Sequence, residues 1–235
     1  MLMFDPIFFL IIAPALLLAF YAQLKVKSAY AQMSQVRASM TGYEAARRVL
    51  DAGGLQSVEI EQVPGHLSDH YDPRDKVLRL SPEVYRGSSM ASVGIAAHEA
   101  GHALQDAKNY APLVIRNLAV PAANFGSSIG SLLLMVGMGM LFFTGASVLG
   151  KWVFLAGIIA FGATVVFQVI NLPVEFDASA RAKTQLVNLG IVSGADLHYV
   201  SKVLNAAALT YVAATLQAVL TLLYYIMRYM QATRD

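Results

Sequence analysis

The sequence predicts a mainly α-helical membrane protein, in which three to four spanning helices carry a small α+β domain. Of its 235 residues, 57% are hydrophobic and 14% are charged, whereas soluble domains carry about 25% charged residues. Several windows without any charged side chain are as long as the about 20 residues that a membrane crossing requires. Most of the remaining polar residues gather in one stretch, from about Lys25 to Tyr110, which is long enough to form a small folded domain.

Residues 1–24 are expected to form the first transmembrane helix. Pro6 to Leu24 carries no charged residue, and a proline such as Pro14 is tolerated inside a spanning helix. A cleaved signal peptide is the alternative, but no positively charged segment precedes the apolar run. We therefore expect the segment to stay in the membrane.

Residues 117–174 are expected to form a transmembrane helical hairpin, because they are uncharged except for Lys151. Residues 203–227 form a fourth apolar segment, which is expected to span as well, although its polar face would also suit a helix that packs inside the protein or lines a cavity. Small residues in the first half of the hairpin would let its two helices approach closely: Gly126, Ser127, Ser128, Gly130, Gly137 and Gly139.

Residues 25–112, together with residues 175–202, are expected to form the polar domain. Gly42–Ala52 has the pattern of an amphipathic helix that ends at two glycines. Leu55–Val63 alternates like a strand, and Val77–Leu80 is a second, shorter strand. A long helix rich in small residues is expected to begin at residues 87–89 and to run to about Asp106.

Residues 98–102 read HEAGH, an instance of the pattern H-E-x-x-H. On a helix, His98 and His102 lie one above the other on a single face, so both imidazoles can reach one metal ion. Glu99 would stand beside that ion, where its carboxylate can take a proton from water and pass it to a leaving amine. Chance occurrence is the competing interpretation, but the small and apolar residues before the motif are typical of a helix buried against a neighbour. The motif therefore predicts a catalytic zinc site.

A catalytic zinc ion needs a third protein ligand and one open position. The sequence contains no cysteine, which leaves His66, His70, His198 or a carboxylate. Glu175 is the first acidic residue after the long uncharged run, where the hairpin is expected to leave the membrane and a helix to begin. The same position also suits an ordinary first-turn glutamate favoured by the helix dipole, and spacing alone does not separate these two interpretations.

The stretches HEAGHALQ (98–105) and EFDASARA (175–182) resemble the YugP-like family of neutral zinc metallopeptidases. That family is similar in plan to the HtpX-type membrane proteases, which are gluzincins. Residues 67–81 and 203–214 resemble the family too, so the likeness covers most of the chain. It implies a zincin-like α+β domain in a bacterial membrane protein.

The resemblance also implies one zinc ion per chain, held by His98, His102 and Glu175, with Glu99 as the general base. Gluzincins often have an aspartate four residues after the ligand glutamate, where it orients a zinc-bound histidine. Here that position is Ser179, and Asp177 lies two residues after Glu175. Both Asp177 and Ser179 are therefore candidates for supporting the site.

Two further predictions concern substrate binding. In zincins an edge strand before the metal helix commonly binds the substrate backbone by strand addition. The strand formed by Val77, Leu78, Arg79 and Leu80 is expected in that place, although a plain sheet strand fits the pattern equally. His70 would either stabilise an oxyanion or cap a turn between neighbouring aspartates, and we favour the turn.

The distribution of basic residues predicts that the polar domain faces the cytoplasm. Lys25, Lys27 and Arg37 follow the first span, whereas the loop of the hairpin carries only Lys151. An even number of crossings separates the HEAGH motif from Glu175, so the two can meet on one side of the membrane. Protein or peptide substrates and the lipid bilayer are the expected partners, while a membrane-protein partner and a homo-oligomer are both left open.

The predicted function is that of a membrane-embedded zinc-dependent endopeptidase, which hydrolyses peptide bonds of proteins at the cytoplasmic membrane face. The alternative is an inactive zinc-binding scaffold or chaperone-like partner, but a scaffold has no need of the acid at Glu99. Nucleic acid is not an expected partner, because 17 basic and 15 acidic residues leave a net charge of only +2 without a clustered basic face.

Overall fold

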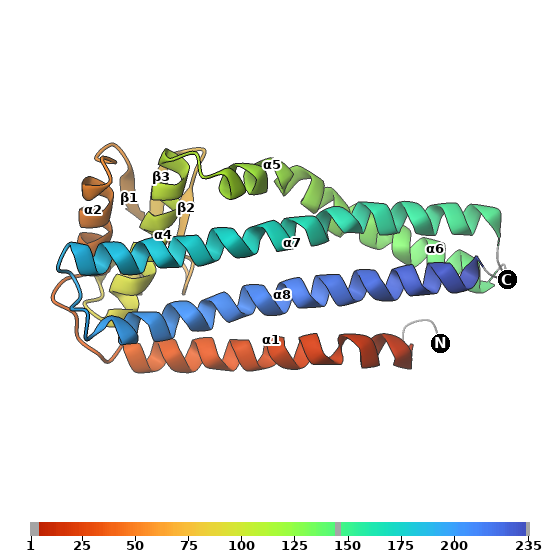
Figure 1. The fold of residues 1–235 in the computed structure, drawn as a ribbon, viewed down its shortest axis with the longest axis horizontal. Helices are drawn as coiled ribbons and strands as arrows, with labels where there is room; N and C mark the ends of the chain where they lie inside the picture. Colours follow the sequence, from red (N-terminus) through yellow and green to blue (C-terminus); the bar gives the residue numbers. More distant parts are fainter. Residues whose placement is uncertain (1–4, 144–146, 234–235) are drawn as a thin grey trace. The chain divides into compact units, whose positions relative to one another are not determined.

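The computed structural model describes residues 5–143 and 147–233, which are mainly helical and include a small mixed sheet (Figure 1). The predicted fold class is therefore confirmed. The chain forms two compact units. Unit 1 comprises the described residues of 1–21, 115–172 and 211–235, and unit 2 comprises residues 22–114 and 173–210. Residues 1–4 and 144–146, which belong to the predicted first span and hairpin, lie outside the described parts.

The elements follow one another along the chain as labelled in Figure 1. The helices are α1 (Pro6–Met33), α2 (Gly42–Ala52), α3 (Pro82–Arg86), α4 (Met90–Ala107), α5 (Ala111–Phe125), α6 (Ser131–Phe143), α7 (Val148–Asn188) and α8 (Leu197–Ala232). A π-helical turn, η1 (Gly126–Gly130), joins α5 to α6, and the strands are β1 (Glu59–Gln62), β2 (His70–Asp72) and β3 (Val77–Leu80).

Four helical segments in the described parts of the chain are long and apolar enough to cross a membrane. They are α1, the segment from Ala111 to Phe143, α7 and α8. By length and composition α8, whose polar residues also suited a helix packed inside the protein, therefore qualifies alongside the other three.

Unit 1 is held together by close packing of apolar helices. Leu134 of α6 and Phe154 and Ile158 of α7 form its core, and a Cβ atom at Gly137 would lie 2.5 Å from the Phe154 backbone. Gly126 and Gly130 make similarly close approaches to α7, as predicted. A Cβ atom at Gly139 would meet nothing within 4 Å, and Ser127 and Ser128 are exposed. The prediction of a close helix contact is therefore wrong for these three residues.

The sheet of unit 2 has the order β1-β3-β2, with β1 parallel and β2 antiparallel to β3. Leu78 and Leu80 of β3 are fully buried, which anchors the sheet in the core of the unit. The predicted strand from Leu55 to Val63 is shorter than expected, because Leu55 and Val58 are used in turns that close α2.

Helix α2 packs on the metal-motif helix α4 in unit 2. The side chain of Thr41 accepts a hydrogen bond from the backbone N–H of Glu44, whose carboxylate accepts one from the N–H of Thr41, and this capping box starts α2. Ser89 caps α4 in the same way through the N–H of Ser92. The two helices, the strands and the C-terminal part of α7 share one apolar core.

Helix α7 continues without a break from Val148 to Asn188. The prediction that a new helix begins in residues 171–183 is therefore wrong. Pro173 lies inside α7, where its missing N–H and its ring are tolerated, as in other long apolar helices. The interpretation of Glu175 as a first-turn residue is wrong as well, because Glu175 lies far inside α7.

Candidate metal centre

Helix α4 places His98 and His102 one turn apart on a single face. Their ring centroids are 4.8 Å apart and the rings are nearly perpendicular, at 82°. Most residues of α4 are buried, many of them alanine or glycine, so the helix can lie between neighbours on several sides. The arrangement of the two imidazoles is therefore the one that the HEAGH spacing predicts.

Gly101 lets α4 touch α7 at the level of this motif. A Cβ atom at this position would lie 2.7 Å from the carbonyl oxygen of Ala178, a distance that real Cβ contacts do not reach. The two backbones can approach only because this side chain is absent. Glu175 lies almost one turn before Ala178 on α7, so this contact brings its carboxylate to the histidines.

Three possible metal ligands from these two helices converge. Oε2 of Glu175 is 3.3 Å from Nε2 of His98 and 3.7 Å from Nε2 of His102, and the three donor atoms all lie within 4.8 Å of one another. Zinc bonds of about 2.0–2.2 Å in a tetrahedron separate neighbouring ligand atoms by about 3.3–3.6 Å. The donor set and its spacing therefore fit a zinc ion.

The surroundings of Glu175 support that fit. The residue is only 6% exposed, and its buried Oε2 atom has no hydrogen-bond partner among the described residues. A buried carboxylate oxygen without a donor is costly unless a cation satisfies it. A metal ion between the three side chains would provide that cation.

A second set of contacts holds the far side of each imidazole. Oγ of Ser179 lies 3.1 Å from Nδ1 of His98, and Oε1 of Gln105 lies 2.9 Å from Nδ1 of His102. If each Nδ1 carries the proton and donates it to its partner, each Nε2 keeps a free lone pair that points toward Glu175. Both rings are then held in the tautomer that binds a metal.

Gln105 also links the two helices. It is fully buried, and its Nε2 donates to the carbonyl of Val174 and to Oδ2 of Asp177, each at 2.8 Å. Asp177 in turn accepts a hydrogen bond of 2.5 Å from Arg181. Ser179 therefore contacts a histidine directly, whereas Asp177 reaches the other histidine through Gln105.

Sequence reasoning did not assign a role to Gln105. The available signal was its spacing, because a residue three positions after His102 on a helix lies on the same face as that histidine. Its partners on α7 are about seventy positions away, so no local pattern could have shown them.

Glu99 is half-buried and has no hydrogen-bond partner among the described residues. Burial raises the pKa of its carboxyl group, and the nearby His98 and His102 act in the opposite direction. A carboxylate with a raised pKa that still reaches solvent is suited to proton transfer near neutral pH.

The predicted substrate strand is corrected by the sheet order. Val77, Leu78, Arg79 and Leu80 form the central strand β3, which pairs with β1 on one side and with β2 on the other. The backbone groups on both edges of β3 are hydrogen-bonded to these neighbours, so β3 cannot pair with a substrate strand. The prediction that it binds substrate is therefore wrong. Among the described strands, the outer edges of β1 and β2 remain unpaired.

The remaining histidines do not join the metal group. His70 is exposed, and its Nδ1 lies 2.8 Å from the carbonyl oxygen of Ser68, a local contact of the kind expected for a turn. His66 contacts the ring of Tyr30, and His198 is exposed with its Nδ1 near the carbonyl of Ala195. Within residues 5–143 and 147–233, the group of possible ligands contains only His98, His102 and Glu175.

Comparison with known proteins decides the family. The profile described as "Putative neutral zinc metallopeptidase" matches residues 8–230. The chain belongs to this family. It is also 48% identical, over 222 residues, to "Putative membrane protease YugP" of Bacillus subtilis (strain 168), a match that covers 93% of this chain and 94% of the relative. No solved structure gives a significant match.

Membership of the neutral zinc metallopeptidase family agrees with the donor set. The family description names zinc, and the described residues bring together two histidines and one glutamate. The four apolar helical segments agree with the membrane location in the relative's name. The resemblance that HEAGHALQ and EFDASARA indicated is thereby confirmed.

Proposed function

We propose that this protein is a zinc-dependent endopeptidase that hydrolyses proteins at the cytoplasmic face of a bacterial membrane. One observation carries the proposal: His98, His102 and Glu175 converge from two helices, and a buried oxygen of Glu175 has no hydrogen-bond partner among the described residues. The family supports zinc as the metal and peptide bonds as the target.

His98, His102 and Glu175 would hold one zinc ion per chain and leave one position open. When bound, zinc would polarise the scissile carbonyl and make water a nucleophile near neutral pH. Gln105 and Ser179 would keep both imidazoles in the ligating tautomer through their contacts with Nδ1.

Glu99 would be the general base. Its carboxylate is partly exposed, so it can accept a proton from the attacking water and pass it to the leaving amine. A non-catalytic zinc site has no use for such a group, so its presence favours the peptidase over the inactive scaffold.

The substrate would approach from the side of β2, whose outer edge is unpaired among the described strands. An extended peptide could then pair with that edge by strand addition. Residues 25–112 and 175–202 would form the catalytic domain, and the basic residues Lys25, Lys27 and Arg37 after the first span would keep it in the cytoplasm.

The test combines zinc content with proteolysis of an unfolded substrate such as casein, on protein purified in detergent. We expect about one zinc per chain and cleavage that a chelator abolishes. Glu99→Gln should keep the metal and lose cleavage, whereas Glu175→Ala should lose both. Glu59→Gln, which changes an exposed glutamate of β1, is the matched control and should leave both unchanged.

Two results would contradict the proposal. If Glu99→Gln cleaves as fast as the wild type, Glu99 is not the base. If the wild type binds zinc but cleaves neither casein nor a set of membrane-protein fragments, the inactive scaffold is the better account.

A further inference from the structure

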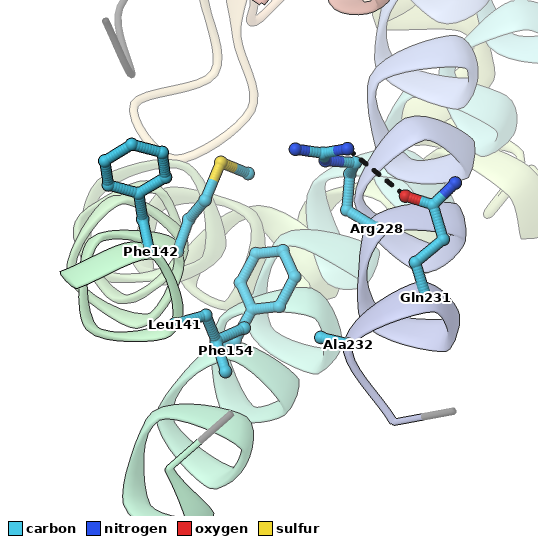
Figure 2. Close-up of a pocket in the computed structure, with 7 residues that line it drawn as sticks. Leu141, Phe142, Phe154, Arg228, Gln231 and Ala232 are labelled. Atoms are coloured by element: carbon cyan, nitrogen blue, oxygen red, sulfur yellow. Dashed lines mark hydrogen bonds between the residues drawn. The ribbon is translucent and has the colours of Figure 1, made fainter. Parts of the chain in front are cut away.

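A cavity of about 290 Å³ lies in unit 1, at the ends of α6, α7 and α8 (Figure 2). Met138, Leu141, Phe142 and Phe154 form an apolar wall, and Arg228 and Gln231 of α8 provide its polar side. Phe142 is 61% exposed whereas Phe154 is fully buried. The cavity therefore runs from the surface of the unit to its apolar core.

The cavity lies at the ends of helices that are candidate membrane spans, where a bilayer would change from hydrocarbon to headgroups. Its lining residues come from the last two turns of α6, the second turn of α7 and the last two turns of α8, all of them parts of candidate spans. Trp152 and Lys151 lie at the same end of α7, and Trp152 is 65% exposed. Tryptophan and lysine at the end of a spanning helix are typical of the membrane interface.

Arg228 retains hydrogen-bonding capacity toward this cavity. Its Nη1 donates to Oε1 of Gln231 at 3.2 Å, and the nearest carboxylate oxygen, Oδ2 of Asp5, is 3.6 Å from Nη2. That oxygen already accepts a hydrogen bond of 2.6 Å from Tyr224. Beside this long ion pair, the one side-chain hydrogen bond that the guanidinium donates within the described residues goes to Gln231. A guanidinium binds a phosphate through two parallel hydrogen bonds.

We propose that this cavity binds an anionic phospholipid. Its phosphate would sit on Arg228 and Gln231, and one acyl chain would lie against the wall formed by Met138, Leu141, Phe142 and Phe154. Arg228 is the charged residue among those that line the cavity, and its charge is positive. A headgroup with its own ammonium group would meet the same positive charge, so a lipid of net negative charge is favoured.

The site is separate from the metal centre, whose residues all belong to unit 2. The proposal does not depend on peptidase activity, and its test measures lipid binding alone.

The test uses the full-length protein, stripped of lipid in a neutral detergent. Phosphatidylglycerol and phosphatidylcholine with identical acyl chains are added, and bound lipid is counted by native mass spectrometry while the Tm is recorded. We expect phosphatidylglycerol to remain bound and to raise the Tm, and phosphatidylcholine to do neither. Arg228→Gln should weaken phosphatidylglycerol binding by about 10- to 100-fold, because it removes charge-assisted hydrogen bonds to the phosphate.

Two further variants separate this site from general effects of charge and folding. Lys151→Gln removes a cation at the same end that does not line the cavity, and it should leave binding within about threefold of the wild type. Met138→Trp fills the cavity without changing any charge and should also abolish binding, which tests the site even if Arg228→Gln fails to fold.

Three results would overturn the proposal. The two lipids could bind equally, Lys151→Gln could weaken binding as much as Arg228→Gln, or Met138→Trp could leave phosphatidylglycerol binding intact.

Discussion

Replacing Gln105 with leucine tests whether the buried amide holds His102 for metal binding. The substitution nearly preserves volume but removes the acceptor 2.9 Å from Nδ1 of His102. On α7, Asp177 and the carbonyl of Val174 each lose the hydrogen bond that Gln105 donates. This loss is smaller, because Asp177 keeps its hydrogen bond from Arg181 and Val174 remains inside the helix. The cost should therefore fall mainly on His102.

The expected magnitude can be reached in two ways. Removing the partner of a metal-bound histidine typically lowers metal affinity by about 10- to 100-fold, which is about 1.4–2.8 kcal/mol. Leaving one buried donor unpaired costs about 1–3 kcal/mol, and His102 is only 9% exposed. Both routes give the same range, so we expect zinc to bind Gln105→Leu about 10- to 100-fold more weakly.

The assay is competition for zinc with a chelator of known affinity, at fixed pH and in detergent. Ser89→Ala is the control, because it removes the N-cap of the same helix far from the ligands and should cost about 0.5–2 kcal/mol of stability. It should bind zinc as the wild type does. Zinc affinity within about threefold of the wild type in Gln105→Leu, or an equal loss in Ser89→Ala, would refute the role given to Gln105.

Three further predictions concern packing and pH. Gly101→Ala should lower both Tm and zinc affinity, at a cost of about 1–3 kcal/mol or more, because the added Cβ would clash with the carbonyl of Ala178. A Cβ at Gly162 of α7 would meet nothing within 4 Å, so Gly162→Ala is the control and should be neutral. Equal effects of the two substitutions would contradict the close approach of α4 and α7. Leu80→Ala should destabilise the protein by about 2–5 kcal/mol, since Leu80 is fully buried; a loss below about 1 kcal/mol in thermal or denaturant unfolding would place it outside the core. Burial raises the pKa of Asp69 despite hydrogen bonds from Ser81, so the carboxyl binds its proton more tightly in the folded than in the unfolded state. Its contribution to stability is therefore lost as pH rises above about 4. When Tm is measured against pH, the Tm of the wild type should fall relative to that of Asp69→Asn over that range, and the opposite trend would contradict the burial of Asp69.

Local patterns predicted several elements closely. The apolar face and the two glycines after it defined α2, and the short apolar run defined β3, both with the bounds that the structure shows. Charge-free length identified the four apolar segments. These features depend on residues within one or two turns of each other, so the sequence is sufficient to show them.

Predictions that depended on where a segment ends or what it pairs with were less accurate. The helix expected to begin near Glu175 is part of α7, because Pro173 did not interrupt it. The strand expected at an edge is central, because β2 pairs with it through a loop of only a few residues. Strand order and the continuation of a helix through proline depend on tertiary neighbours rather than on local propensity.

The sequence by itself determined that two histidines share a helical face, that no thiolate can bind the metal and that the chain has enough apolar length to enter a membrane. Only the tertiary structure decided that Glu175 is the carboxylate beside them, that Ser179 and Gln105 each hold one imidazole, and that β3 has no free edge. The physical reason is that helical spacing and hydrophobic length are set along the chain, whereas the meeting of α4 and α7 depends on a contact between Gly101 and Ala178, residues far apart in the sequence.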